Sequence, residues 1–194
     1  MFSVESHKWL CAPVGAGFLY ARPERQSLPQ PLVVSWGWES RAPSGSRFQD
    51  FFGWTGTDDP AAYLSVPAAI TFPRTRNWPA VRAACHALAS EACQRIAALT
   101  GAKQIAPDSP LWWAQMVAAP LPLASQKALD DMKRRLWDDY QVEVPLHFWN
   151  GRSYIRISIQ AYNTPRDVDR LLEGLERLLP RSGALPDKSR TDGR

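Results

Sequence analysis

Arg156 is the charged residue whose sequence setting is most informative about chemistry. It lies in the run Tyr154–Gln160, in which isoleucines occupy every second position. Because side chains alternate between the two faces of a strand, Arg156 is expected on the face opposite the isoleucines. A guanidinium on a rigid strand can hold a carboxylate through two parallel hydrogen bonds. The same pattern also fits an arginine on a solvated face, so the periodicity leaves both interpretations open.

Two segments nearer the N-terminus carry other groups that could bind or react. Lys8 follows His7, and a lysine amine forms Schiff bases with carbonyls when its surroundings favour the neutral amine. Gly56 and Thr57 lie in the segment 54–58, where a glycine lets a backbone N–H approach an anion and a threonine hydroxyl can donate to phosphate. Taken alone, these segments also fit a solvated lysine and an ordinary polar turn.

The cysteines do not form a recognisable framework. Cys11, Cys85 and Cys93 are an odd and widely spaced set, which argues against a disulfide scaffold and suits a reducing cytoplasm. His86 beside Cys85 raises the alternative of a metal site, but Cys85 and Cys93 fall on the apolar stripe of a predicted helix. We therefore expect buried thiols and no metal.

These groups must be positioned by a chain whose pattern changes near residue 77. Before that point the sequence predicts strand and loop, with a short buried strand in the apolar run at 15–20. After it, apolar residues recur at spacings of three and four, which predicts a helix over 77–100. Asn77 has the type of an N-cap, and Gly101 has the type that ends a helix.

The rest of the chain predicts a strand, a helix, a hairpin and a helix. The apolar run 111–117 favours a strand, and Ser125 can open a helix. Asn150-Gly151 is typical of a type I′ turn, here between strands at 142–149 and 152–160. A further helix is expected to begin at Thr164, which can cap it, with Pro165 in its first turn and Asp167 as the acid of a capping box. This order predicts a small α+β layer with helices on one face of a sheet.

Composition and charge exclude several classes of protein. Of 194 residues, 45% are hydrophobic and 22% charged, close to globular averages, which excludes wholesale disorder and collagen. The net charge of +4 comes with most cations near acids and no basic stripe, so we expect no nucleic-acid partner. Uncharged stretches at 9–21 and 109–126 are interrupted by proline, and the first also by glycine, so we expect no membrane span or signal peptide. A soluble cytoplasmic protein is expected.

In their order along the chain, several blocks together resemble the class V aminotransferase family of pyridoxal-phosphate enzymes, with the isopenicillin N epimerase-like branch nearest. The resemblance runs from residue 7 to about residue 178, and its first block is the most specific. The blocks are Ser6–Pro13, Gly15–Tyr20, Trp54–Asp58, Ala62–Ile70 and Ile155–Ser158 with Tyr162-Asn163.

The resemblance implies an α/β fold with an α+β C-terminal part, namely a truncated fold-type-I, aspartate aminotransferase-like transferase with a complete small C-terminal domain. Residues 1–76 would end the large domain that binds pyridoxal phosphate, and 77–100 would be a linking helix. Residues 101–180 would be the small domain, and 181–194 a disordered tail.

The resemblance also implies roles for the residues singled out above. Lys8 would form the internal aldimine, a Schiff base with pyridoxal 5′-phosphate, and move the substrate's α-proton. His7 would lie beside the cofactor phosphate, and Gly56 and Thr57 would reach the phosphate of the neighbouring subunit in a homodimer. Arg156 would bind the α-carboxylate of a small amino-acid substrate.

Epimerase and aminotransferase chemistry share the aldimine and a carbanion, as does lyase chemistry, so the resemblance leaves these reactions open. It disfavours desulfurase chemistry, because the last cysteine, Cys93, falls on a predicted helix and not on a loop. The family lysine lies past the middle of a much longer chain. We therefore expect a C-terminal part that is inactive alone.

Two alternatives to that expectation remain. The chain would be a non-catalytic fragment or interaction module if only the small domain folds. A separately encoded N-terminal half would instead complete the active site.

Overall fold

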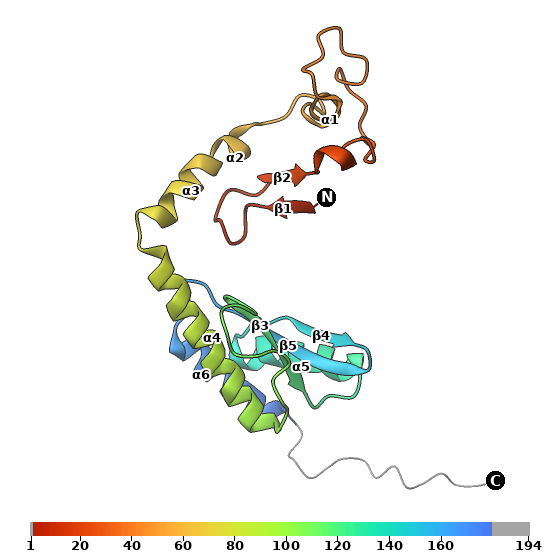
Figure 1. Ribbon diagram of the computed structural model, residues 1–194. Coiled ribbons are helices and arrows are strands. Elements are labelled where there is room, and N and C mark those ends of the chain that lie inside the picture. The colour runs from red at the N-terminus through yellow and green to blue at the C-terminus, as the bar shows by residue number, and fades with distance from the viewer. Residues whose placement is uncertain (1, 180–194) are drawn as a thin grey trace, which may run out of the picture. The chain divides into compact units, whose positions relative to one another are not determined.

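Figure 1 shows a computed structural model of the chain, which describes residues 2–179. The chain divides into two compact units, the first ending at Asn77 and the second beginning at Trp78. The tail expected at 181–194 lies outside the described residues. Among the described residues, no helix combines the length and the apolar character needed to cross a membrane.

The first unit combines a two-stranded antiparallel sheet with short helices. Strand β1 pairs with β2 so that Glu5 lies opposite Gly17. The side chains buried in this unit are small apart from Phe51, which stacks on Trp38 with ring centroids 4.8 Å apart. The elements are β1 (Phe2–Glu5), β2 (Gly17–Tyr20), the 3₁₀ helix η1 (Pro23–Arg25), α1 (Arg47–Phe52), α2 (Ala61–Leu64) and α3 (Val66–Arg74).

Two predictions for this unit need correction. The strand expected at 15–20 forms at 17–20, but all its residues are exposed and not buried, because β2 has a single strand partner among the described residues. Residues 61–74 are helical and not loop. The sequence pattern did not reveal them because α2 is very short and α3 contains Pro67 and Pro73, a residue type that usually interrupts helices.

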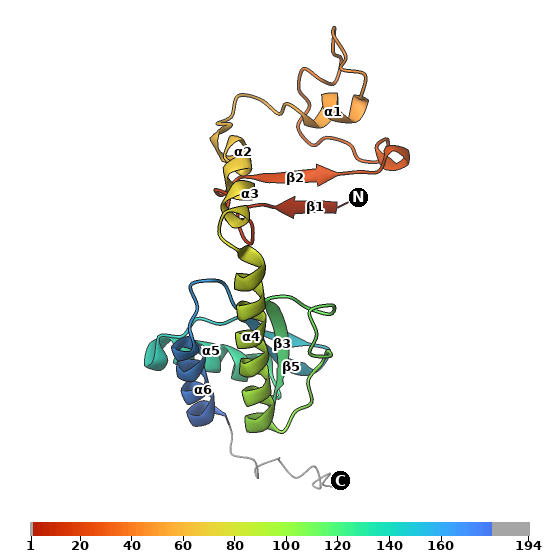
Figure 2. The same ribbon diagram turned by 60° about the vertical axis from the view of Figure 1, so that its left-hand side comes forward.

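The second unit is a three-stranded antiparallel sheet with helices on one face, as predicted. Strand β5 lies between β3 and β4. Figure 2 shows α4 and α6 side by side against the sheet. The elements are α4 (Trp78–Thr100), β3 (Met116–Leu121), α5 (Gln126–Tyr140), β4 (Leu146–Trp149), β5 (Arg152–Ser158) and α6 (Pro165–Leu178).

One hydrophobic core joins these elements. The predicted stripe of α4 contributes Cys85, Ala92 and Ile96, and β5 contributes its isoleucines. Burial of such side chains is the main source of stability for the unit. Fully buried members include Ile96, Leu129, Leu136, Ile155 and Leu175.

The predicted turns and most predicted helix ends are confirmed. Asn150 and Gly151 have φ of 50° and 73°, as a type I′ hairpin turn requires. The Ser125 hydroxyl accepts from the Ala128 N–H, and the Thr164 N–H donates to the Asp167 carboxylate at 2.7 Å. Gly101 ends α4 with φ 68°.

The start of α4 differs from the prediction. Asn77 precedes this helix with φ 46°, and so lacks the extended conformation typical of an N-cap.

Both outer strands differ from their predicted bounds. The strand expected at 111–117 lies at 116–121, because residues 112 and 113 form a turn in which both N–H groups donate to the Ser109 carbonyl. Pro120 is tolerated because β3 is an edge strand. The strand expected at 142–149 begins only at Leu146. The Pro145 carbonyl accepts a hydrogen bond from the Arg156 N–H at 3.0 Å. Because proline has no N–H, Pro145 cannot donate the reciprocal hydrogen bond to Arg156, and the strand pairing ends there.

Candidate active site

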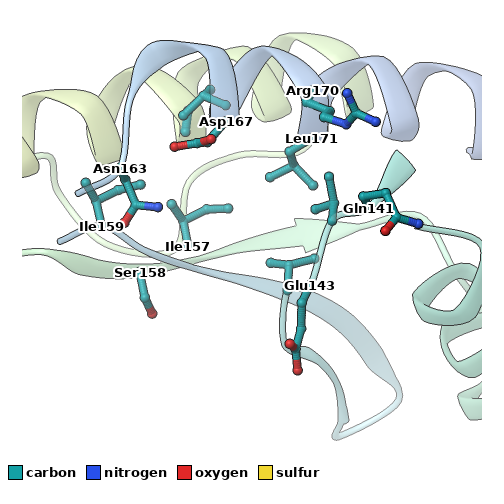
Figure 3. A pocket seen from close by; sticks show the side chains of 13 residues that line it. Gln141, Glu143, Ile157, Ser158, Ile159, Asn163, Asp167, Arg170 and Leu171 are labelled. Atoms are coloured by element: carbon teal, nitrogen blue, oxygen red, sulfur yellow. The ribbon is translucent and has the colours of Figure 1, made fainter. Parts of the chain in front are cut away.

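Arg156 lies on the outer face of the sheet, opposite the helices. Ile155 and Ile157, its neighbours in β5, are buried on the helix side, which confirms the alternation inferred from the sequence. Directly across on β3 lies Ala118, which has a small side chain. Figure 3 shows the same alternation one step further along, where Ile157 points toward α6 and Ser158 points away from it.

The guanidinium of Arg156 has a buried donor without a partner. Its Nε is inaccessible to solvent and makes no hydrogen bond to any described residue. An unpaired buried donor is costly, and more so on a charged group. A carboxylate is the ligand that a guanidinium pairs with most readily. The buried Nε therefore argues against the alternative of an arginine on a fully solvated face.

His7 and Lys8 lie in a closed loop that follows β1. Two backbone hydrogen bonds close it, from the Ser6 N–H to the Ala16 carbonyl at 2.9 Å and from the Ala12 N–H to the Ser6 carbonyl at 3.1 Å. The Lys8 ammonium forms an ion pair with the Glu5 carboxylate, and Nε2 of His7 lies 3.7 Å from the same carboxylate. The Lys8 side chain is 64% exposed. The structure thus brings His7 and Lys8 together around Glu5.

Glu5 was not singled out from the sequence, although a carboxylate three residues before a lysine is a usable signal for such a pair. The hydrogen bond from Lys8, and then its positive charge, lower the pKa of Glu5. The pair is therefore intact above the ordinary pKa of a glutamate and is lost as the pH falls through the lowered value.

We expect Lys8→Gln to raise the pKa of Glu5 toward its ordinary value, because the charge-assisted hydrogen bond and the positive charge of Lys8 are removed. Carbon-detected NMR titration of the Glu5 carboxyl measures this directly. Lys133→Gln, at an exposed lysine in the second unit, is the matched control and should leave the titration unchanged. An unchanged midpoint in Lys8→Gln would show that the ion pair does not form in solution.

Gly56 and Thr57 lie in a separate loop between α1 and α2. Gly56 has φ 132° with open space around it, a conformation that favours glycine. Thr57 is exposed, and Trp54 just before it stacks on Trp36 with centroids 6.2 Å apart. Within residues 2–179, no hydrogen bond joins this loop to His7 or Lys8. The loop is therefore a candidate anion contact apart from the lysine loop.

The cysteines of α4 are buried thiols, as predicted. Cys85 and Cys93 are free and buried. Burial, and to a lesser extent the nearby Asp108 carboxylate, raises the pKa of Cys93 to about 11. The thiolate is the nucleophilic form of cysteine, so Cys93 is not set up as a nucleophile.

A cavity of about 280 Å³ lies between α6, the end of β5 and residues 141–144. Figure 3 shows Leu171 and Ile157 facing one another across it, with Glu143 and Ser158 pointing away. The cavity is thus on the helix side of the sheet, and Arg156 does not line it. It is separate from the face of the sheet that carries Arg156.

The fold is that of the fold-type-I enzymes that depend on pyridoxal phosphate, as predicted. The apo cysteine desulfurase of Thermococcus onnurineus aligns with a TM-score of 0.64 over 91% of this chain and 46% of that chain, at 18% identity. The sequence model described as Aminotransferase class-V matches residues 1–171. The chain belongs to the class V aminotransferase family, whose cofactor is pyridoxal 5′-phosphate.

Two isopenicillin N epimerases are similar in sequence to most of this chain. The chain is 33% identical over 187 residues to the isopenicillin N epimerase of Streptomyces clavuligerus. It is 31% identical over 186 residues to that of Amycolatopsis lactamdurans. Each match covers 91% of this chain and 46% of the relative. The chain thus spans about half the length of the curated relatives it matches.

The residues around Lys8 fit part of a pyridoxal-phosphate site. An exposed lysine amine can reach an aldehyde, and an imidazole beside it can donate to a phosphate. The carboxylate in contact with Lys8, that of Glu5, pairs with the ammonium. The described loop therefore presents an exposed lysine amine to which an aldehyde cofactor could attach.

Proposed function

We propose that the chain is the C-terminal part of a pyridoxal-phosphate enzyme that acts on an amino acid by epimerase or aminotransferase chemistry. The observation that carries this proposal is the buried, unpartnered Nε of Arg156, which suits the carboxylate of an amino acid. In this assignment residues 1–76 end the cofactor-binding domain, 77–100 link it to the small domain, and 101–180 form the small domain.

Lys8 is assigned to cofactor attachment and to movement of the α-proton. When bound, pyridoxal phosphate supplies an electron sink for the electron pair left when that proton departs. Lys8 must first lose its own proton, and Glu5 opposes this by holding the ammonium. His7, Gly56 and Thr57 are assigned to the phosphate, and Arg156 orients the substrate through its α-carboxylate.

This chain alone is proposed not to turn over substrate. The exposed Lys8 side chain has no protein wall to exclude water, and water weakens every electrostatic interaction at such a site. Activity would then need further polypeptide, either a separately encoded N-terminal half or a homodimer in the intact enzyme. The buried free thiols of Cys85 and Cys93 support a reducing, cytoplasmic setting.

The test is covalent labelling of Lys8. The chain is incubated with pyridoxal phosphate, reduced with borohydride and digested, and the modified lysine is located by mass spectrometry. We expect weak labelling, well below one cofactor per chain, with the label at Lys8 and lost in Lys8→Ala. Lys133→Ala, at an exposed lysine on α5, should keep the label.

Two results would overturn the proposal in different ways. Tight labelling of one cofactor per chain that disappears in Lys8→Ala would overturn the claim that the chain is inactive alone. Equal labelling in wild type and in Lys8→Ala would overturn the assignment of Lys8.

A second candidate is a non-catalytic module that keeps only the folded small domain. The specific observation in its favour is that the hydrophobic core cluster runs from Cys85 to Leu175 and so lies entirely in the second unit. Limited proteolysis tests this second candidate, because resistance of the first unit would exclude it.

A further inference from the structure

The outer face of the sheet carries a second arginine in line with Arg156. Along β5, Arg152, Tyr154 and Arg156 occupy alternate positions, so their side chains stand on the same face. On this face, the flanking strands contribute Met116, Ala118, Pro120, His147 and Trp149. We call these residues, with Arg152, Tyr154, Arg156 and Ser158, the outer face.

On the outer face, the side chains that flank β5 are small on one side and large on the other. On the β3 side, Ala118 lies opposite Arg156 and Pro120 lies opposite Tyr154, so the side chains there are small. On the β4 side, His147 lies opposite Tyr154 and Trp149 lies opposite Arg152, so the side chains there are large aromatic rings. Trp149 is 69% exposed and stands beside the guanidinium at the hairpin end. A ligand lying along β5 would have one wall of aromatic rings.

The two arginines of the outer face differ in exposure, because Arg152 is exposed whereas Arg156 is half-buried and its Nε is inaccessible to solvent. Neither Arg152 nor Arg156 has an ion pair with any residue from 2 to 179. The paired positions of the outer face include no carboxylate. The acid next to them is Glu143, which lies beyond Pro145 and points away from α6 in Figure 3. Because that direction is toward the side of the sheet on which Arg156 lies, Glu143 offsets part of the charge near Arg156, and the positive charge of the outer face is strongest at Arg152.

We propose that Arg152 binds a second acidic group, at the far end of the substrate side chain. This inference rests on the proposed function, because it takes Arg156 as the site of the α-carboxylate. The two arginines are four residues apart on one strand, which corresponds to about 13 Å between their Cα atoms. Side chains stand roughly perpendicular to a sheet, so a ligand that reaches both needs a long side chain. The substrate class is an amino acid whose extended, mainly apolar side chain ends in a carboxylate.

The test compares two ligands of equal length on the full chain. 2-Aminosuberate has the distal carboxylate, and 2-aminooctanoate has a methyl group in its place. Binding is followed by NMR on the Nε–H signals of the arginines, assigned from Arg152→Gln and Arg156→Gln. We expect 2-aminosuberate to bind about fivefold more tightly, the upper range for a partly exposed ion pair. Both Nε–H signals should shift with 2-aminosuberate, and only that of Arg156 with 2-aminooctanoate.

The variants make the prediction specific. Arg152→Gln should remove the difference between the ligands and leave 2-aminooctanoate binding unchanged, whereas Arg156→Gln should weaken both. Arg166→Gln, the same charge change at an exposed position of α6, is the control and should change neither.

Two outcomes would overturn the inference, and they differ in what they say of the proposed function. If the two ligands bind equally and shift only the Arg156 signal, the role of Arg152 is wrong and the carboxylate site stands. If neither ligand shifts the Arg156 signal, the proposed function fails as well.

Discussion

Leu136→Ala is expected to lower the free energy of unfolding of the second unit by about 3 to 4 kcal/mol, within the range for replacing a buried leucine by alanine. Leu136 has 0% exposure and lies in the core cluster. A Cβ placed on Gly174 of α6 would come within 2.7 Å of its Cδ2, so the leucine fills the space between α5 and α6. Its removal leaves a cavity that the packed sheet and helices cannot close.

Urea unfolding followed by circular dichroism measures this loss. Trp137→Ala is the matched control, because Trp137 is the next residue in α5 and is 53% exposed. It is expected to change stability by about 0.5 kcal/mol or less. Equal effects of the two substitutions would mean that α5 packs through a different face in solution.

Limited proteolysis is expected to remove the first unit and leave the second intact. Trypsin should cut the first unit at least about tenfold faster than α5, because open loops are exposed without global unfolding. A two-stranded sheet is marginal by itself, and β1–β2 is such a sheet. Residues 26–46 also contain no helix or strand. Cleavage after Arg74 or Arg76 would release a product that begins just before α4.

Mass spectrometry of the products over time identifies the resistant fragment. The control is the same digestion in denaturant, where the sites after Lys127 and Lys133 in α5 should be cut as fast as those of the first unit. If the first unit resists as long as the second in native buffer, the candidate of a module that keeps only the small domain is wrong.

Local signals predicted the second unit well. The hairpin turn at Asn150-Gly151 and the capping box at Thr164 depend on neighbouring residues only, and both form as expected. The face of Arg156 also followed from alternation. The buried state of its Nε did not, because it depends on packing against other strands.

Features set by distant partners could not be predicted. The position of β3 is fixed by its register with β5, where Met116 lies opposite Ser158, and no local pattern contains that register. The exposure of β2 reflects its single partner. The hydrogen bond from the Ser6 N–H to the Ala16 carbonyl, which closes the loop that holds Lys8, likewise joins residues that are not neighbours in the sequence.

Pro145 ends the ladder between β4 and β5, and this bears on how the hairpin folds as well as on its length. The Asn150-Gly151 turn fixes the strand pairing at one end, and the missing N–H of Pro145 stops it at the other. A slip of one residue would carry Arg156 into the core and an isoleucine onto the outer face. The proline thus limits the register in which β4 and β5 can pair, and with it the face of the sheet on which Arg156 lies.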